Sequence, residues 1–353
     1  MRILLIAGGW SNEREISLTG GKAIAAALRE IGHDIEWLDP AVEFAQLAQK
    51  ATQADFALLN LHGAPGEDGL IQAFLDRLGC PYQGSGPAGS LLALDKAAAK
   101  SLYVHAGVAT PPWELLIPNH DPEWQPSLRF PLFIKPNQGG SSLGVQRVYS
   151  QQELQTQLSD PKHHFPALLL EEAVQGNEVT CAIVGETALP PILIQPAQDA
   201  PFFDYHSKYT PEAAQEICPA PLSNAVTAAV QEAAYRAHKT LGLQGYSRTD
   251  FILADGTPYA LETNTLPGMT PNSLLPRAAA ARGQSFAELV QELIDLGRPG
   301  IIHFVFGYFF YKFSGDFPKG YNIITPVVHT EKIPGQVAVH FVYLFFGHWG
   351  MGA

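Results

Sequence analysis

The sequence predicts an α/β and α+β protein that begins with a parallel-sheet domain. Apolar strand-like runs alternate with an amphipathic helix over the first 95 residues, as in βαβ units. Two later segments each combine short strands with a helix, which is an α+β pattern. The chain has 353 residues, 46% of them hydrophobic and 16% charged, which is enough for several packed domains and excludes a disordered protein.

The first domain is expected over residues 1–95. Its elements are strands at 2–9, 35–40 and 56–63, a helix at 20–34, a helix at 69–79 and a loop at 80–90. Because parallel strands need crossover connections, the order of these elements predicts a Rossmann-like sheet.

Two further segments follow this domain. A helix at 94–107 opens the central segment, 96–175, which continues as a strand, a glycine-rich turn and a strand over 130–148, then a helix and an apolar run at 167–174. The third segment, 176–300, holds an apolar run at 179–185, a loop at 202–214, a long helix at 224–242, a hairpin at 248–264 and a closing helix at 285–297.

The hairpin carries the most informative chemistry. Two apolar runs meet at an Asp-Gly turn, with Asp250 at the start of the first run and Glu262 and Asn264 at the end of the second. Side chains two apart share one face of a strand, and antiparallel pairing can bring Asp250 alongside them. Such oxygen ligands suit Mg²⁺ held together with a nucleotide triphosphate. The alternative is a surface hairpin with solvated acids.

A glycine-rich turn at 136–144 lies between two predicted strands, directly after Lys135. Its glycines and serines can direct backbone N–H groups toward an anion, which predicts a phosphate-binding turn. It differs from the P-loop pattern because no Lys-Ser or Lys-Thr pair and no helix follow it. The alternative is a flexible turn.

Charge and targeting signals limit the partners and the compartment. The net charge is -12, from 22 basic and 34 acidic residues, so a nucleic-acid partner is not expected. The short apolar run at the N-terminus ends in paired glycines and does not have the form of a secretory signal. Three widely spaced cysteines fit a reducing compartment. We therefore expect a cytoplasmic protein with no membrane partner.

The last 53 residues, 301–353, differ from the rest, since they contain nine of the 19 phenylalanines and five charges. Neither apolar run in this tail reaches the ~18 residues expected of a membrane span. The tail is therefore interpreted as extra strands, as a partner-binding patch, or as sequence foreign to this fold.

Several motifs in order carry a family resemblance. They are GGWSNEREIS at 8–17, LHGAPGEDG at 61–69, YQGSG at 82–86, DYHSKY at 204–209 and ETNTLPGMTPNSLLP at 262–276. Together with the lysines, the glycine-rich turn and the acidic hairpin, they resemble the D-alanine–D-alanine ligase family of the ATP-grasp superfamily over residues 1 to about 298. The resemblance implies a two-lobed ATP-grasp fold after the N-terminal domain.

The resemblance also implies site residues. ATP contacts are expected from Lys96, Lys135, Glu171, Glu178 and Lys208, and two Mg²⁺ or Mn²⁺ ions are expected on Asp250, Glu262 and Asn264. The first D-alanine is expected to bind at His62 and at Glu13, which is linked to Ser141 and Tyr209. Arg248 and Gly268 are expected to bind the oxyanion. Ser273 and Leu274 are expected to bind the carboxylate of the second D-alanine. One departure is Glu172, at a position where relatives often carry a lysine that supports adenine.

The implied activity is ATP-dependent joining of two D-alanines through an acylphosphate, for peptidoglycan precursor synthesis, by a homodimer. Two alternatives stay open. A D-alanine–D-lactate ligase would share the nucleotide residues but typically lacks the tyrosine found here at Tyr209. A catalytically dead ATP-binding protein would keep the fold alone. For Glu13, the structural alternative is compensation of a helix dipole, and for His62 it is a structural histidine.

Overall fold

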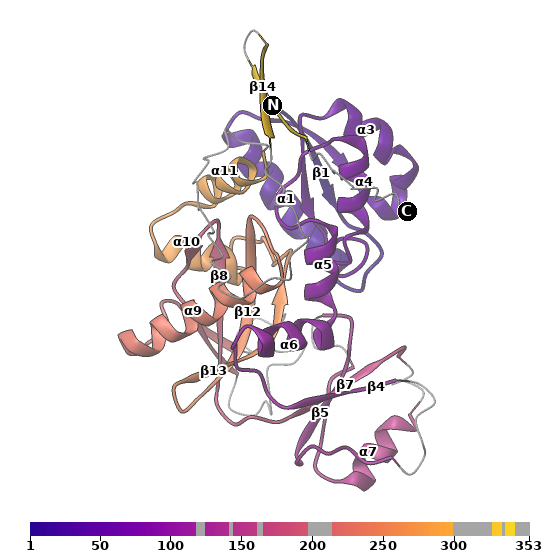
Figure 1. Cartoon of the computed structure of the whole chain (residues 1–353), viewed down its shortest axis with the longest axis vertical. Helices are drawn as coiled ribbons and strands as arrows, with labels where there is room; N and C mark the ends of the chain where they lie inside the picture. The colour runs from indigo at the N-terminus through magenta and orange to yellow at the C-terminus, as the bar shows by residue number, and fades with distance from the viewer. Residues whose placement is uncertain are drawn as a thin grey trace, which may run out of the picture. The chain divides into compact units, whose positions relative to one another are not determined.

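The computed structural model describes residues 1–117, 124–140, 144–160, 165–196 and 214–298, and two strands at 327–333 and 336–342. The chain divides into one unit of Met1–Ile302 and a second of His303–Ala353, and each is described by itself. Within the first unit, a parallel sheet at the N-terminal end is followed by two antiparallel sheets (Figure 1). The predicted fold class is confirmed.

The parallel sheet has the strand order β2-β1-β3. Its strands are β1 (Arg2–Ala7), β2 (Asp34–Leu38) and β3 (Phe56–Asn60), and the surrounding helices are α1 (Arg14–Glu30), α2 (Pro40–Glu43), η1 (Phe44–Gln46), α3 (Leu47–Gln53) and α4 (Leu70–Leu78). Every residue of β3 is buried, as expected of a strand in a parallel sheet that is covered on both faces.

Helix α1 begins six residues before the predicted start at residue 20. Gly20 and Gly21 had marked the boundary, but both lie inside the helix and are buried. A Cβ on Gly21 would lie 2.5 Å from the Trp37 ring, and one on Gly20 would lie 2.8 Å from Asn60 Nδ2. The glycines therefore allow close packing of the helix on the sheet, and the predicted helix start was wrong for that reason.

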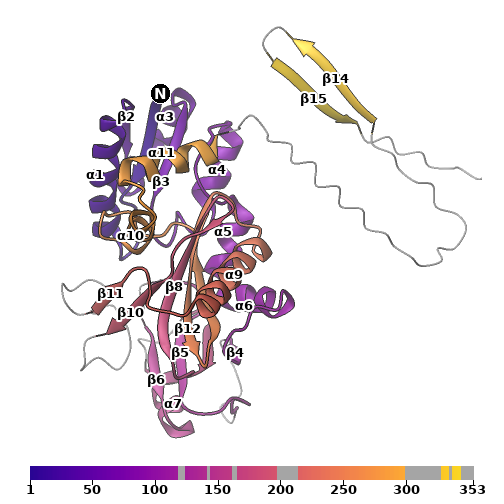
Figure 2. The same cartoon turned by 90° about the vertical axis from the view of Figure 1, so that its left-hand side faces the viewer.

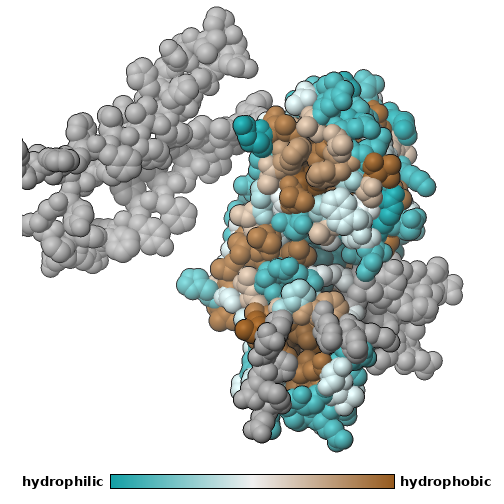
Figure 3. All heavy atoms as spheres, turned by 90° about the vertical axis from the view of Figure 1, so that its right-hand side faces the viewer, coloured by the Kyte–Doolittle hydropathy of each residue, from teal (hydrophilic) through white to brown (hydrophobic). Residues whose placement is uncertain are grey.

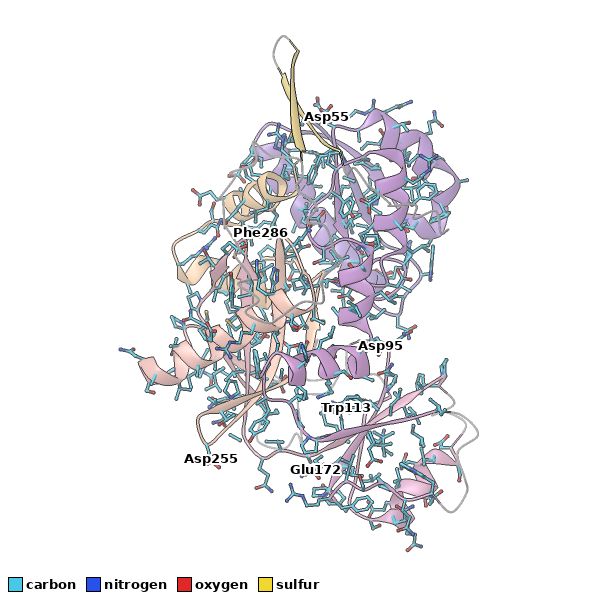
Figure 4. All side chains as sticks on the ribbon, in the orientation of Figure 1. Asp55, Asp95, Trp113, Glu172, Asp255 and Phe286 are labelled. Carbon is cyan, nitrogen blue, oxygen red and sulfur yellow. The ribbon has the colours of Figure 1, made fainter. Side chains whose placement is uncertain are left out.

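The predicted helix at 94–107 and part of the predicted loop at 80–90 form two helices, α5 (Pro87–Leu94) and α6 (Lys96–His105). Pro87 starts α5 because proline fits the first turn of a helix. Asp95 separates the two helices (Figure 4), and its side chain accepts a hydrogen bond from the Ala98 N–H at 3.0 Å. This N-cap fixes the first residue of α6, Lys96, at the helix terminus.

The second sheet has the order β4-β7-β5-β6 and is antiparallel. Its elements are β4 (Trp113–Leu116), β5 (Leu132–Pro136), β6 (Gln146–Val148), β7 (Leu168–Glu172) and helix α7 (Gln151–Leu158). Leu132, Ile134 and Leu170 form its core with Leu154 of α7. The predicted strands, helix and apolar run of the central segment are confirmed, whereas residues 141–143 of the glycine-rich turn lie outside the described residues.

The third sheet has the order β11-β10-β8-β12-β13, with β9 paired to β8. Its strands are β8 (Asn177–Val184), β9 (Thr187–Ala188), β10 (Ile192–Pro196), β11 (Ala214–Ile217), β12 (Tyr246–Ala254) and β13 (Thr257–Asn264). Helix α9 (Asn224–Thr240) packs on it through Val230, Ala234 and Ala237 (Figure 2). The predicted long helix and hairpin are confirmed, whereas β10 and β11 were not predicted.

The last two helices of the first unit return to the parallel sheet. They are α10 (Leu274–Ala281), which was not predicted, and α11 (Phe286–Gly297), which begins with a capping box between Ser285 and Glu288. Leu275 of α10 and Leu293 of α11 share one core cluster with Ile3 of β1. The loop after β13 belongs to the same cluster through Leu266 and Met269.

Exposed apolar side chains occur on one face of the first unit (Figure 3). Trp10 and Phe44 meet edge to face with ring centroids 6.0 Å apart, and Phe74 lies 6.3 Å from Phe44. All three are exposed. Among the residues that the structure describes, no helix has the length and apolar character needed to cross a membrane.

In the second unit, β14 (Val327–Ile333) and β15 (Gln336–Val342) form an antiparallel hairpin. The three interpretations of the tail stay open. The three core clusters of the described residues are built from positions before residue 295. These clusters supply the packing of the first unit.

A chain that ends at Gly300 is therefore expected to keep its activity and to gain solubility, because the apolar tail is removed and the described core is kept. Soluble yield and phosphate release would be measured for both lengths. Loss of expression on truncation would show that the tail is packed against the fold.

Candidate functional site

The hairpin of β12 and β13 places the predicted acidic trio at one end. Asp250 is the register partner of Glu262, and Arg248 is the partner of Asn264. A β-bulge follows Asp250, which locally re-aims the strand. The predicted proximity of Asp250 to the two residues on β13 is confirmed.

Asp250 is held by three neighbours. Arg248 donates to both carboxylate oxygens, from Nε and from Nη2, at 2.9 Å each. Thr180 Oγ1 donates to Oδ1 at 2.6 Å, and Asn264 Nδ2 donates to Oδ2 at 3.2 Å. Burial alone would lower the pKa of Arg248, but Asp250 raises it above its ordinary value, so the Arg248 guanidinium stays cationic.

Lys96 connects the glycine-rich turn to the hairpin. Its Nζ donates to Gly139 O at 2.6 Å and lies 3.1 Å from Glu262 Oε2. The turn is also tied to the start of α6, because Asn137 accepts hydrogen bonds from Lys96 N at 3.1 Å and from Ala97 N at 2.9 Å. An ammonium group therefore lies between the predicted phosphate-binding turn and the predicted metal ligands.

Lys135 lies on β5, and its Nζ is 2.6 Å from Glu171 Oε1 on β7. A second lysine, Lys100 on α6, forms an ion pair with Glu171 Oε2. Burial alone would raise the pKa of the Glu171 carboxyl, but the two lysines lower it below its ordinary value. Lys100 was missed in the sequence, although its spacing of four from Lys96 would have placed both on one helix face.

Glu13, His62 and Glu67 gather where the N-terminal domain meets the loop after β13. Glu13 Oε2 lies 3.3 Å from the position that a Cβ on Gly140 would occupy, which brings it against the glycine-rich turn. Burial lowers the pKa of His62, which keeps its ring neutral, and its buried Nε2 has no hydrogen-bond partner among the described residues. An orphaned ring nitrogen of this kind fits a bound ligand.

Glu67 lies in the LHGAPGEDG motif at 61–69, but it was not predicted as a site residue. The Gly63 N–H donates to its Oε2 at 2.8 Å. Burial and the nearby charges of Glu13 and Glu262 raise the pKa of Glu67 to about 7. A carboxyl that titrates near neutrality beside His62 is a mark of a functional site.

Replacement of Glu67 by glutamine is expected to stabilise the protein progressively as the pH rises. The folded pKa of Glu67 exceeds its ordinary 4.5, so its contribution to stability is complete below pH 4.5 and is lost as the pH rises to about 7. Glutamine does not ionise, so it has no such loss. Between pH 5 and pH 8, the free energy of unfolding of the variant should therefore rise relative to wild type by on the order of 1 kcal/mol, which corresponds to a few degrees in melting temperature. If the difference in melting temperature between variant and wild type were the same at pH 5 and pH 8, the raised pKa of Glu67 would be contradicted.

The remaining predicted residues occupy the loop after β13 and the start of β8. Ser273 is the N-cap residue of α10 and Leu274 is its first residue, so backbone N–H groups at this helix start lack intrahelical partners. A Cβ on Gly268 would lie 3.0 Å from Ser273 Oγ, so a larger residue at this position would crowd the Ser273 side chain. Glu178 lies on β8, opposite Ile252 of β12.

Three predicted residues, Ser141, Lys208 and Tyr209, lie outside the residues that the structure describes. Glu172, at the position where relatives often carry a lysine, is the last residue of β7 (Figure 4). Its carboxylate pairs with Arg129 at 2.9 Å. This position therefore holds a carboxylate that is already paired with a cation.

The hairpin donors fit a hard divalent cation, since they are two carboxylates and an amide whose NH₂ faces Asp250. The four hydrogen bonds to Asp250 would have to rearrange if a cation bound its oxygens. In the described part of the chain, no group of three or more His, Cys, Asp or Glu side chains is placed to hold a metal.

Two antiparallel sheets bring lysines, a glycine-rich turn and an acidic hairpin together, which is the arrangement of a ligase of the ATP-grasp class. The family described as "D-ala D-ala ligase C-terminus" matches residues 102–295. The D-alanine–D-alanine ligase of Nitratidesulfovibrio vulgaris strain DP4 is 55% identical over 298 residues, 84% of this chain and 98% of that protein. The chain belongs to the D-alanine–D-alanine ligase family.

Other relatives agree with this assignment. The D-alanine–D-alanine ligase of Oleidesulfovibrio alaskensis is 56% identical over 84% of this chain and 96% of that protein. A structure of D-alanine–D-alanine ligase from Bacillus anthracis complexed with ATP superposes with a TM-score of 0.75, at 35% identity, over 84% of this chain and 97% of that one. The VanG D-Ala:D-Ser ligase from Enterococcus faecalis has a TM-score of 0.73 at 28% identity, over 84% and 99%.

Proposed function

We propose that this protein uses ATP to join two D-alanine molecules into D-alanyl-D-alanine, the dipeptide used for peptidoglycan precursors. The observation that carries the proposal is the 3.1 Å contact between Lys96 and Glu262, which brings the phosphate-binding turn and the acidic hairpin to one place in a chain 55% identical to a named D-alanine–D-alanine ligase. The D-lactate and catalytically dead alternatives are not favoured, because the relatives at this identity are named for the dipeptide reaction.

In the first step, a carboxylate oxygen of the first D-alanine attacks the γ-phosphorus of ATP, and the bond to the bridging oxygen of ADP breaks. Catalysis of such a transfer rests on positioning and on charge neutralisation. We assign the phosphate contacts to Lys96, Lys135 and Lys208, with Glu171 and Glu178 on the nucleoside side. Asp250, Glu262 and Asn264 would hold two Mg²⁺ or Mn²⁺ ions, which neutralise phosphate charge when bound.

In the second step, the amine of the second D-alanine attacks the acyl carbon and loses a proton, and phosphate leaves with the C–O bonding pair. The oxyanion of the tetrahedral intermediate needs donors, which we assign to Arg248 and the N–H of Gly268. Ser273 and the N–H of Leu274 would hold the carboxylate of the second D-alanine, at the start of α10.

We assign the first D-alanine to the cluster of Glu13 and His62. A carboxylate at Glu13 fits a cationic amine, and the unpartnered Nε2 of His62 fits the substrate carboxylate. Ser141 and Tyr209 are proposed to join Glu13 in a hydrogen-bonded link that ties the first domain to the loops of the other two. The loop that carries Lys208 is proposed to close over the γ-phosphate and to exclude water from the acylphosphate.

The domain boundaries, the compartment and the oligomeric state are also proposed. We assign a substrate domain to 1–95, two ATP-grasp lobes to 96–175 and 176–300, and an atypical tail to 301–353. The protein is proposed to act in the cytoplasm as a homodimer, without nucleic-acid or membrane partners, and light scattering after size exclusion would test the dimer.

The activity is tested by phosphate release from MgATP with a panel of D- and L-amino acids and D-lactate. Release is expected with D-alanine and only background release with L-alanine. Binding of ATP without phosphate release in the presence of D-alanine would favour the catalytically dead alternative. Depsipeptide as the main product near neutral pH would favour the D-lactate ligase.

A further inference from the structure

Lys100 is a lysine with no exposed side-chain surface. Its Nζ reaches three elements, because it pairs with Glu171 of β7, donates to Thr110 Oγ1 at 2.6 Å and lies 3.4 Å from Ala260 O of β13. Burial lowers the pKa of Lys100 to about 8, and the charge of Glu171 opposes that shift. A buried charge is costly unless it is paired and hydrogen-bonded, so these contacts maintain the ammonium.

Glu171 is shared between two ammonium groups, with Lys135 on Oε1 at 2.6 Å and Lys100 on Oε2. Two lysines and one carboxylate leave a net charge of about +1 on the group, by simple count. Lys100 therefore balances Glu171 from the protein interior. It leaves the charge of Lys135 less compensated than it would be in an isolated pair.

The position of Lys100 also links the two antiparallel sheets. Thr110 Oγ1 donates to the same Ala260 carbonyl at 2.7 Å, and Ala260 N donates to Ala109 O at 2.8 Å. The segment that leads into β4 is thus pinned to β13, two residues before Glu262. Lys100 completes this junction by adding Glu171 of β7.

We propose that Lys100 is a positioning residue for ATP, which holds Glu171 in place and thereby sets Lys135 relative to the hairpin that carries Glu262. This inference rests on the proposed function for the identity of the nucleotide. It assigns no contact between Lys100 and ATP itself. Its effect is on nucleotide affinity, and the amino-acid sites are unaffected.

The test replaces Lys100 by methionine, which keeps the length of the side chain and removes its charge. The Kd for MgATP, measured by calorimetry, is expected to rise about tenfold or more, whereas KM for D-alanine stays within about twofold of wild type. The matched control is Lys50→Met, which removes a lysine paired with Glu43 at 3.1 Å on the N-terminal domain. This control is expected to leave the Kd for MgATP unchanged.

A second variant, Lys100→Gln, keeps a donor for Thr110 without the charge and replaces the methionine variant if that one does not fold. An unchanged Kd for MgATP in a folded Lys100 variant would overturn the proposal, even if the melting temperature fell. Calorimetry needs no turnover, so failure of wild type to release phosphate with D-alanine would count against the proposed function and not against Lys100.

Discussion

Replacement of Glu262 by glutamine is expected to lower turnover by ~10²-fold or more. Glu262 faces Asp250 across the hairpin and pairs with Lys96 at 3.1 Å, so the change removes a negative charge from the meeting point of the glycine-rich turn and the proposed metal ligands. Glutamine keeps the shape of the side chain but weakens both the proposed cation site and the ion pair with Lys96. Steady-state phosphate release at saturating MgATP and D-alanine gives the measurement.

The control for this variant is Glu232→Gln, which breaks an exposed pair with Arg236 on α9. Exposed ion pairs of this kind contribute little to the stability of the fold, so turnover of the control should match wild type. If Glu262→Gln turned over at nearly the wild-type rate in saturating Mg²⁺, the hairpin would not be the metal site.

Replacement of Arg248 by methionine is expected to reduce kcat by ~10²- to 10³-fold, the cost of losing one oxyanion donor. Arg248 also holds Asp250 through two hydrogen bonds of 2.9 Å, so the change disturbs this proposed metal ligand as well. The rate of dipeptide formation would be measured in single turnovers with MgATP and D-alanine. Circular dichroism and a melting curve would establish that the variant is folded.

Removing Arg248 leaves the Asp250 carboxylate without its cation, which costs about 3–5 kcal/mol at a buried pair. Arg248→Lys separates loss of the charge from loss of the bidentate contact, because lysine keeps the charge but cannot make both hydrogen bonds. Its kcat should lie between those of wild type and Arg248→Met. Arg236→Met provides a surface control. A folded Arg248→Met variant with kcat within about threefold of wild type would exclude a role for Arg248 in the reaction.

The sequence predicted most of the fold because its periodic patterns agree with the packing. The hairpin at 248–264 and the long helix at 224–242 form as expected, since each has a strong pattern and a clear turn or cap. The errors arose where packing overrides local preference. Gly20 and Gly21 resemble a helix boundary, yet they lie inside α1 because Trp37 and Asn60 approach them closely.

The candidate site was predicted in part. The acidic trio follows from strand periodicity, because residues 262 and 264 share a face and the turn sets the register with Asp250. The roles of Lys100 and Glu67 depend on burial and on neighbours from distant segments, which local patterns do not encode. Lys100 reaches Glu171 and Ala260, separated from it by 71 and 160 positions.

The central claim is that the first D-alanine is activated as an acylphosphate before the second one attacks. It is tested most directly with D-alanine labelled with ¹⁸O in its carboxylate, MgATP and the full chain, followed by mass spectrometry of the products. The mechanism predicts that the released phosphate carries one ¹⁸O atom from the substrate and that D-alanyl-D-alanine forms in equal amount. Dipeptide formation with phosphate that carries no label would contradict it.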